Sequence, residues 1–79
     1  MKILLFAAAR QRAGANLIEL NIVVPTTVTV LRREIAEQYP DLASLLASSR
    51  IAANQKFMDE EATLDGSEEI AIIPPVSGG

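Results

Sequence analysis

Hydrophobic residues dominate the first eight positions of the chain and alternate with polar residues a little further on. Residues 2–8 form a nearly continuous apolar segment, which is typical of a strand buried on both faces in the middle of a sheet. The polar residues 10–14 predict a turn. Beyond it, residues 18–24 alternate with the period of a half-buried strand. The pattern therefore predicts a β-hairpin with a fairly long loop.

The middle of the chain has the three- and four-residue spacing of an amphipathic helix. Its apolar positions form one stripe of Val28, Leu31, Ile35 and Tyr39. The polar positions of this helix are expected to face water, namely Arg32, Arg33, Glu34, Glu37 and Gln38. Either Thr27 or Thr29 is expected to cap its N-terminus, and Pro40 to end it. Asp41 is then expected to cap one further turn of helix, which places Leu42, Leu45 and Leu46 against the core.

The last third of the chain is expected to contain short strands. Residues 51–53 and 56–58 flank Asn54 and Gln55, a spacing that permits a hairpin, although Gln55 suits a tight turn poorly. Residues 65–67, Asp-Gly-Ser, predict a turn before an apolar strand at residues 69–73.

These elements predict an α+β roll, one sheet with a helix packed across it. The first and last strands are both apolar enough to lie in the centre, but periodicity leaves open whether they are parallel or antiparallel. We expect residues 1–73 to form the domain and residues 74–79 to form a flexible tail. At 79 residues, 49% of them apolar, the chain has room for a single core.

Composition excludes several classes of protein. Without cysteine, neither a disulfide framework nor a thiolate zinc site can form. The net charge of −3, with acidic residues gathered in the last third, argues against a nucleic-acid partner, because phosphate binding requires clustered Lys and Arg. Arg10 and Arg12 interrupt the first apolar run, so it is too short for a signal peptide or a membrane span. We expect a cytoplasmic protein without a membrane partner.

Enzyme chemistry within the chain is disfavoured. Histidine and cysteine are both absent, which removes the commonest general base, the strongest nucleophile and the best metal ligands. Carboxylates remain, but they fall in predicted loops and strand starts, where no apolar pocket is expected to raise a pKa. An acid–base enzyme is therefore an unfavoured alternative, and no metal ligands are predicted.

The unusual segment is the C-terminus, Pro74-Pro75-Val76-Ser77-Gly78-Gly79, which follows directly on the last predicted strand. Prolines favour an extended backbone, and six extended residues reach about 20 Å. The two final glycines could enter a channel too narrow for any Cβ. The carboxylate of Gly79 is inert until adenylation by ATP supplies a leaving group. Attack by a sulfur donor would then give a thiocarboxylate, although Gly-Gly at a chain end is by itself often only a frayed end.

Residues 65–79 resemble the closing motif of a known family, in which a DGDEVA-type turn and strand lead into PPVSGG. This family is the small sulfur-carrier subunit of molybdopterin synthase, a ubiquitin-like β-grasp protein. Residues 4–10, residues 29–31, the Tyr39-Pro40 pair and the Ala53-Asn54 pair match it too, so that the resemblance covers essentially the whole chain. The chain departs from the family at Ser67, often Asp, and at Ile72 and Ile73, often aromatic. These departures are expected to alter surface contacts near the tail.

The resemblance implies a function carried by the tail. Gly79 would be adenylated by an E1-like adenylyltransferase that consumes ATP, and a sulfur donor protein would convert it to a thiocarboxylate. The tail would then enter the large catalytic subunit, where its sulfur passes to cyclic pyranopterin monophosphate in two rounds. This chain would bind no cofactor itself. The expected partner contacts are Ile72, Ile73, Pro74, Pro75, Val76, Ser77 and Gly78, with one of the two isoleucines in the core.

Three alternatives stay open at this point. A sulfur carrier for thiazole and thiamin or for amino-acid biosynthesis would share the Gly-Gly end and the fold. A ubiquitin-like modifier would instead end in an isopeptide bond between Gly79 and a lysine of its target. A binding module with an unimportant tail would tolerate an extra residue after Gly79.

Overall fold

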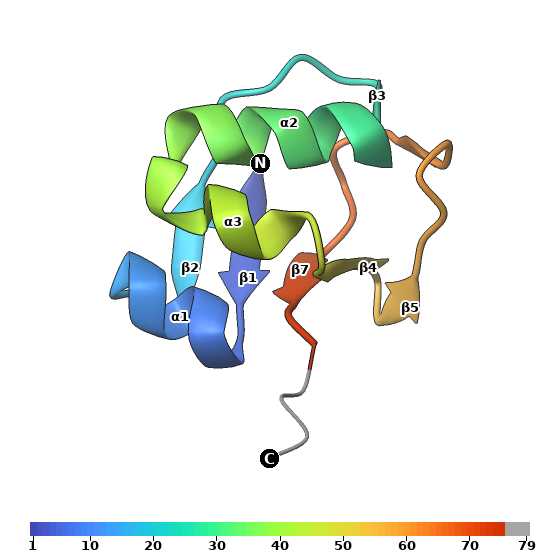
Figure 1. Ribbon diagram of the computed structural model, residues 1–79. Coiled ribbons are helices and arrows are strands. Elements are labelled where there is room, and N and C mark those ends of the chain that lie inside the picture. Colours follow the sequence, from blue (N-terminus) through green and yellow to red (C-terminus); the bar gives the residue numbers. More distant parts are fainter. Residues whose placement is uncertain (76–79) are drawn as a thin grey trace.

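A five-stranded sheet with helices gathered on one face forms the body of the protein, in a computed structural model that describes residues 1–75 (Figure 1). Across the sheet the strands run in the order β2 (Leu17–Glu19), β1 (Lys2–Leu5), β7 (Ile70–Ile73), β4 (Arg50–Ala53) and β5 (Lys56–Phe57). The helices are α1 (Ala7–Ala13), α2 (Val28–Gln38), the 3-10 turn η1 (Pro40–Leu42) and α3 (Ala43–Leu46). A separate small ladder pairs β3 (Thr26–Thr27) with β6 (Thr63–Leu64). The predicted α+β roll is confirmed.

The first and last strands lie side by side in the centre of the sheet, as predicted. Ile3 of β1 is opposite Ile18 of β2 in an antiparallel pair and opposite Ile70 of β7 in a parallel pair. β4 pairs with the other edge of β7 in the antiparallel direction. The parallel orientation of β1 and β7 answers the question that periodicity left open.

The segment after β1 differs from the prediction. The strand ends at Leu5, and residues 7–13 form a helix where a continuing strand and then a turn were expected. Ala7 adopts a φ of 50°, which turns the chain sharply, and the alanines and arginines that follow are good helix formers. Gly14, at a φ of 70°, ends the helix with its N–H donating to the carbonyl of Arg10 at 2.9 Å. The predicted pairing of the hairpin is correct, but α1 forms its connection, and its second strand ends at Glu19.

Helix α2 agrees with the prediction at its N-terminus and along its apolar stripe. The backbone N–H of Val30 donates to the Thr27 hydroxyl at 3.3 Å, so Thr27 is the cap. Thr29 instead donates its hydroxyl to the carbonyl of Glu60 at 3.0 Å. The stripe residues Val28, Leu31 and Ile35 are fully buried.

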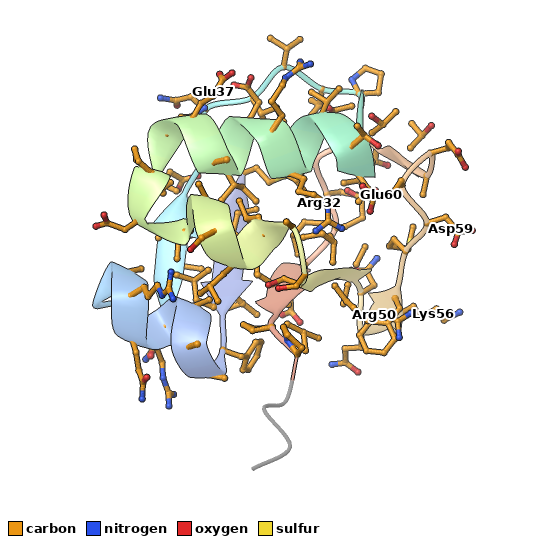
Figure 2. The ribbon with its side chains drawn as sticks, viewed as in Figure 1. Arg32, Glu37, Arg50, Lys56, Asp59 and Glu60 are labelled. Carbon is orange, nitrogen blue, oxygen red and sulfur yellow. The ribbon has the colours of Figure 1, made fainter. Side chains whose placement is uncertain are left out.

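Arg32 does not face water, contrary to the prediction. Its side chain is about one-fifth exposed and donates to the carbonyls of Leu46 and Ser49 and to the carboxylate of Glu60. Figure 2 shows Arg32 and Glu60 side by side near α2, and the ion pair measures 2.6 Å. The hydrogen bond from Arg32 lowers the pKa of Glu60 below its ordinary value. A polar position of the helix thus fastens α2 to α3 and to the loop before β6.

The turn after α2 begins at Pro40, and Asp41 makes no side-chain capping hydrogen bond, so the predicted Asp41 cap is wrong. Proline already has the φ that the first residue of such a turn requires, which makes a side-chain cap dispensable. The burial prediction is correct for Leu42 and Leu46, which are 1% and 2% exposed. Leu45 packs against the same core and is partly buried.

The predicted hairpin of β4 and β5 is confirmed, and its turn uses an unfavourable residue. Asn54 and Gln55 both have positive φ, 52° and 69°, which asparagine tolerates better than glutamine. Asn54 also exchanges two hydrogen bonds with Glu69, one from each backbone N–H, at 2.9 Å each. These bonds fix the turn to the residue that leads into β7.

Candidate functional site

The central strand β7 leads the chain toward its C-terminus at one end of the strands of the sheet. Within it, Ile72 is 1% exposed and belongs to the core, so it is the core member of the two isoleucines and leaves Ile73 as the candidate for a partner contact. Ile73 is half-buried and lies on the opposite face. Pro74 is buried and Pro75 is exposed, so packing continues one residue past the predicted boundary at residue 73. The predicted site residues Val76, Ser77, Gly78 and Gly79 lie outside the described residues.

The face of the sheet opposite the helices carries a row of apolar side chains that crosses all five strands. Strand pairing places these residues directly opposite one another from edge to edge: Leu17, Leu4, Ala71, Ala52 and Phe57. Leu17 and Phe57, at the two ends, are 43% and 52% exposed, Leu4 and Ala71 are partly buried, and the small side chain of Ala52 is only 3% exposed. We call these five residues the open row. No helix of the described chain covers them, so this apolar surface faces outward.

Two shallow hollows lie along the open row. One, of about 300 Å³, is lined by Leu4, Phe6, Ala52, Gln55, Phe57, Glu69, Ala71 and Ile73. The other, of about 540 Å³, lies toward the start of β7 and is lined by Met1, Lys2, Leu4, Leu17, Glu19 and residues 66–69. They share Leu4 and Glu69. The first hollow also includes Ile73, the last residue of β7, which we call the root of the tail because residues 74–79 follow it. The first hollow, which borders Ile73 at the end of β7, is mostly apolar and is suited to receive side chains of another protein.

The positively charged side chain of Arg50 lies at the end of the sheet where β7 ends. Arg50, the first residue of β4, is paired with Ile73 in the register of the sheet. Its guanidinium carbon lies 3.7 Å from the centre of the Phe57 ring. Figure 2 shows Arg50 at the β4–β5 side of the molecule, well away from the Arg32–Glu60 pair. A cation stacked on an aromatic ring therefore adjoins both the open row and the root of the tail.

The loop before β7 holds its acidic groups by local hydrogen bonds. The Asp65 carboxylate accepts from the N–H and the hydroxyl of Ser67 at 2.8 and 2.6 Å, and these bonds lower the pKa of Asp65. Glu68 accepts from the N–H groups of Asp65 and Gly66 at 2.9 and 3.0 Å. Ser67 lies in the loop before β7, at the end of that strand opposite to the one that leads into Pro74. It was expected to affect contacts near the tail, and its position places it elsewhere.

The described residues offer little chemistry of their own. Within residues 1–75, no three acidic side chains come together as metal ligands would. None of the helices in this part of the chain has the length and apolar character that crossing a membrane requires. The features that remain are an outward apolar face, a stacked cation and a strand that ends beside both.

Two functional candidates were not identified from the sequence. Arg50 lies just before the predicted strand at residues 51–53, although its alternation with the buried Ile51 could have placed it on the outward face. Phe57 was expected only as a strand residue. Its role as a stacking partner depends on cross-strand register, which periodicity does not report.

Comparison with known families and proteins gives one consistent result. Residues 3–79 match the ThiS family. A protein of Dictyostelium discoideum named molybdopterin synthase sulfur carrier subunit is 37% identical over 81 residues, a match that covers 99% of this chain and 94% of that protein. The similarity therefore extends over nearly the full length of both chains.

Two solved structures have the same fold. SAMP1 from Haloferax volcanii superposes with a TM-score of 0.84 at 22% identity, covering 100% of this chain and 98% of that one. A protein–protein complex of subunits 1 and 2 of molybdopterin-converting factor from Helicobacter pylori contains a chain with a TM-score of 0.64 at 25% identity, covering 99% of this chain and 96% of that one. The expected ubiquitin-like β-grasp fold is confirmed.

Proposed function

The chain belongs to the ThiS family, and from this membership we propose that it is the sulfur carrier subunit of a molybdopterin synthase. The observation that carries the proposal is the 37% identity, over almost the whole chain, to a protein of that name. The Pro-Pro-Val-Ser-Gly-Gly end and the outward apolar face beside its root are consistent with it.

In this proposal Gly79 undergoes all the covalent chemistry that occurs on this chain. Its carboxylate oxygen attacks the α-phosphorus of ATP and displaces pyrophosphate, which gives an acyl-adenylate. A donor at the oxidation level of sulfide then attacks the acyl carbon, displaces AMP and releases a proton, leaving a thiocarboxylate. That sulfur is delivered to cyclic pyranopterin monophosphate, and water restores the carboxylate of Gly79. Two such rounds supply the two sulfurs of the product.

The chain supplies no general acid or base for these steps. Histidine and cysteine are absent, and its carboxylates are exposed or engaged in local hydrogen bonds. Proton transfers therefore fall to the partner enzymes, an E1-like adenylyltransferase that consumes ATP, a sulfur donor protein and the large catalytic subunit. The chain itself requires no bound cofactor for this role.

Docking to the large subunit is assigned to the open row and Ile73. These residues form an apolar face directly beside the strand that leads into the tail, so a partner that covers the face also receives the tail. The Helicobacter pylori relative is solved as a complex of subunits 1 and 2, which supports a pairing of this kind. Val76, Ser77 and Gly78 are proposed to line the path of the tail into the partner.

A reconstituted transfer reaction tests this function. The thiocarboxylated chain is mixed with the large subunit and cyclic pyranopterin monophosphate, and the product is measured as molybdopterin. We expect product from the wild-type chain and none from a chain that lacks Gly79 or carries one added alanine after it. A chain without its terminal glycine that still supports product formation would contradict the mechanism. Branched conjugates to lysine, with no molybdopterin, would instead favour a protein modifier.

A further inference from the structure

Arg50 is placed where a partner that accepts the tail must approach. It is opposite Ile73, the last residue of β7, in the antiparallel pairing of β4 with β7. Ile51, the next residue, is 1% exposed in the core, so alternation directs Arg50 to the outward face. Its neighbours on that face are apolar, with Ile73 on one side and Phe57 on the other.

The guanidinium of Arg50 is held in position before any partner binds. It lies over the face of Phe57 at 3.7 Å, the arrangement in which the ring attracts a cation. Stacking restricts a long side chain that would otherwise sample many rotamers, so that less entropy is lost when it binds a ligand. It also leaves the edge of the guanidinium, with its N–H groups, available for hydrogen bonds. The stacked pair is thus a preorganised donor set beside an apolar surface.

Within residues 1–75, nothing acidic pairs with Arg50. The two ion pairs of this part of the chain are those of Met1 with Glu19 and of Arg32 with Glu60. Arg32 differs from Arg50 in this respect, because its guanidinium donates hydrogen bonds to two backbone carbonyls and one carboxylate of the same chain. Arg50 makes no such bonds among the described residues. The fold therefore uses one arginine internally and presents the other outward.

We propose that Arg50, stacked on Phe57, binds a carboxylate side chain of the large synthase subunit at the rim of the opening that receives the tail. This inference rests on the proposed function and adds the residue that anchors the docking face. The edge of a guanidinium matches the two oxygens of a carboxylate, and arginine with aromatic neighbours is enriched where interfaces concentrate their binding energy. A single cation within an apolar surface suits one carboxylate, whereas a phosphate site would gather several cations.

A calorimetric titration of the full-length chain into the large subunit tests the proposal, with wild type compared with R50Q, R50K and R33Q. R33Q is the matched control, because it removes the same charge from an exposed position of α2. We expect R50Q to raise the dissociation constant about tenfold to a hundredfold and R33Q to change it less than about twofold. The dissociation constant of R50K should lie between those of R33Q and R50Q. Thermal unfolding of each variant, expected to match wild type, confirms that the fold is intact.

Charge reversal provides the second measurement. R50E should bind more weakly than R50Q, and one acid-to-lysine substitution on the tail-receiving face of the large subunit should restore its binding. Equal losses for R50Q and R33Q would overturn the proposal, because they would show a general charge effect. Unchanged binding of R50Q, or no restoring substitution, would also overturn it. If wild type itself does not bind the large subunit, the proposed function fails and this inference with it.

Discussion

Two adjacent rows of side chains cross the same sheet and share four of its strands, but they lie on opposite faces and differ in how they are covered. The row on the helix side consists of Ile18, Ile3, Ile70 and Ala53, each at most 7% exposed. The open row lies one residue further along each strand of the central pair. Its ends, Leu17 and Phe57, are about half exposed, and of its members only Ala52 is buried. Both rows are apolar, yet only one is covered by helices.

The comparison shows that apolar character in this chain serves two purposes. A sheet of this kind needs one buried face to fold, and a second apolar face adds surface that water must wet. Such surface is retained where another protein covers it. The difference between the rows therefore separates residues that stabilise the chain from residues that we propose bind its partner. Neighbouring isoleucines, Ile72 and Ile73, fall on the two sides of this division.

The largest effect is expected from Ile72→Thr, on the helix side. The substitution keeps a β-branched residue in the strand but replaces the ethyl group by a hydroxyl that is buried in the core, which costs about 2–4 kcal/mol of unfolding free energy. Small domains have about 5–15 kcal/mol in total, so this is a large fraction. Urea denaturation measures it. A loss below about 1 kcal/mol would mean that the helix-side row is not the stabilising one.

The matched substitution Ile73→Thr tests the outward face. Because this side chain is half-exposed, we expect a loss of stability below about 1 kcal/mol. The dissociation constant for the large subunit should rise about tenfold, since burying an isoleucine in an interface contributes about 1.5 kcal/mol or more of binding free energy. Calorimetric titration provides the measurement, with the urea midpoint as the check on folding. Unchanged affinity would remove the outward face from the docking surface.

A smaller change is expected from Gln55→Gly, at the turn that borders the first hollow. Gln55 has a φ of 69°, which costs a residue with a Cβ about 1 kcal/mol and costs glycine little. We expect the substitution to stabilise the chain by about 0.5 kcal/mol after the greater freedom of the unfolded glycine is subtracted. Thermal unfolding detects this as a higher midpoint. A lower midpoint would show that the Gln55 side chain contributes packing that outweighs its backbone strain.

The smallest effect concerns Glu60, which belongs to neither row. Its pKa in the folded chain is lowered from 4.5, chiefly by the hydrogen bond from Arg32, so the ion pair stabilises the fold above that value. As the pH falls through the lowered pKa, Glu60 becomes protonated and this stabilisation is lost. Wild type should therefore exceed Glu60→Gln in stability at pH 7, and the difference should shrink once the pH falls below 4.5 and through the lowered pKa.

Asp59→Asn is the control for this pH dependence, because Asp59 makes no ion pair within residues 1–75. Its stability relative to wild type should show no matching change between pH 7 and pH 3. If Glu60→Gln kept a constant difference from wild type over this range, the ion pair would not be its cause.

The fold was predictable wherever one pattern had one interpretation. The stripe of α2 could only be helical, and Asp65-Gly66 could only be a turn. Residues 2–8 were ambiguous, because alanines suit both a buried strand and a helix, and the sharp turn at Ala7 leaves no signal in composition. Arg32 looks like any polar helix residue until α3 is packed against it.

The candidate site was predictable only in part. Composition and a specific motif identified the tail, and alternation required one of Ile72 and Ile73 to be outward. The open row could not be predicted, because its members come from five strands whose order depends on the parallel pairing of β1 with β7. The stacking of Arg50 on Phe57 depends on the same pairings and became visible only with the register known.

The central claim is that Gly79 carries sulfur, and one measurement tests it most directly. The chain is expressed together with its E1-like adenylyltransferase and a sulfur source, and its intact mass is recorded. The account predicts a form in which one oxygen is replaced by one sulfur, located at Gly79 by fragmentation. Only the unmodified carboxylate, with the same adenylyltransferase shown to activate a known carrier, would contradict it.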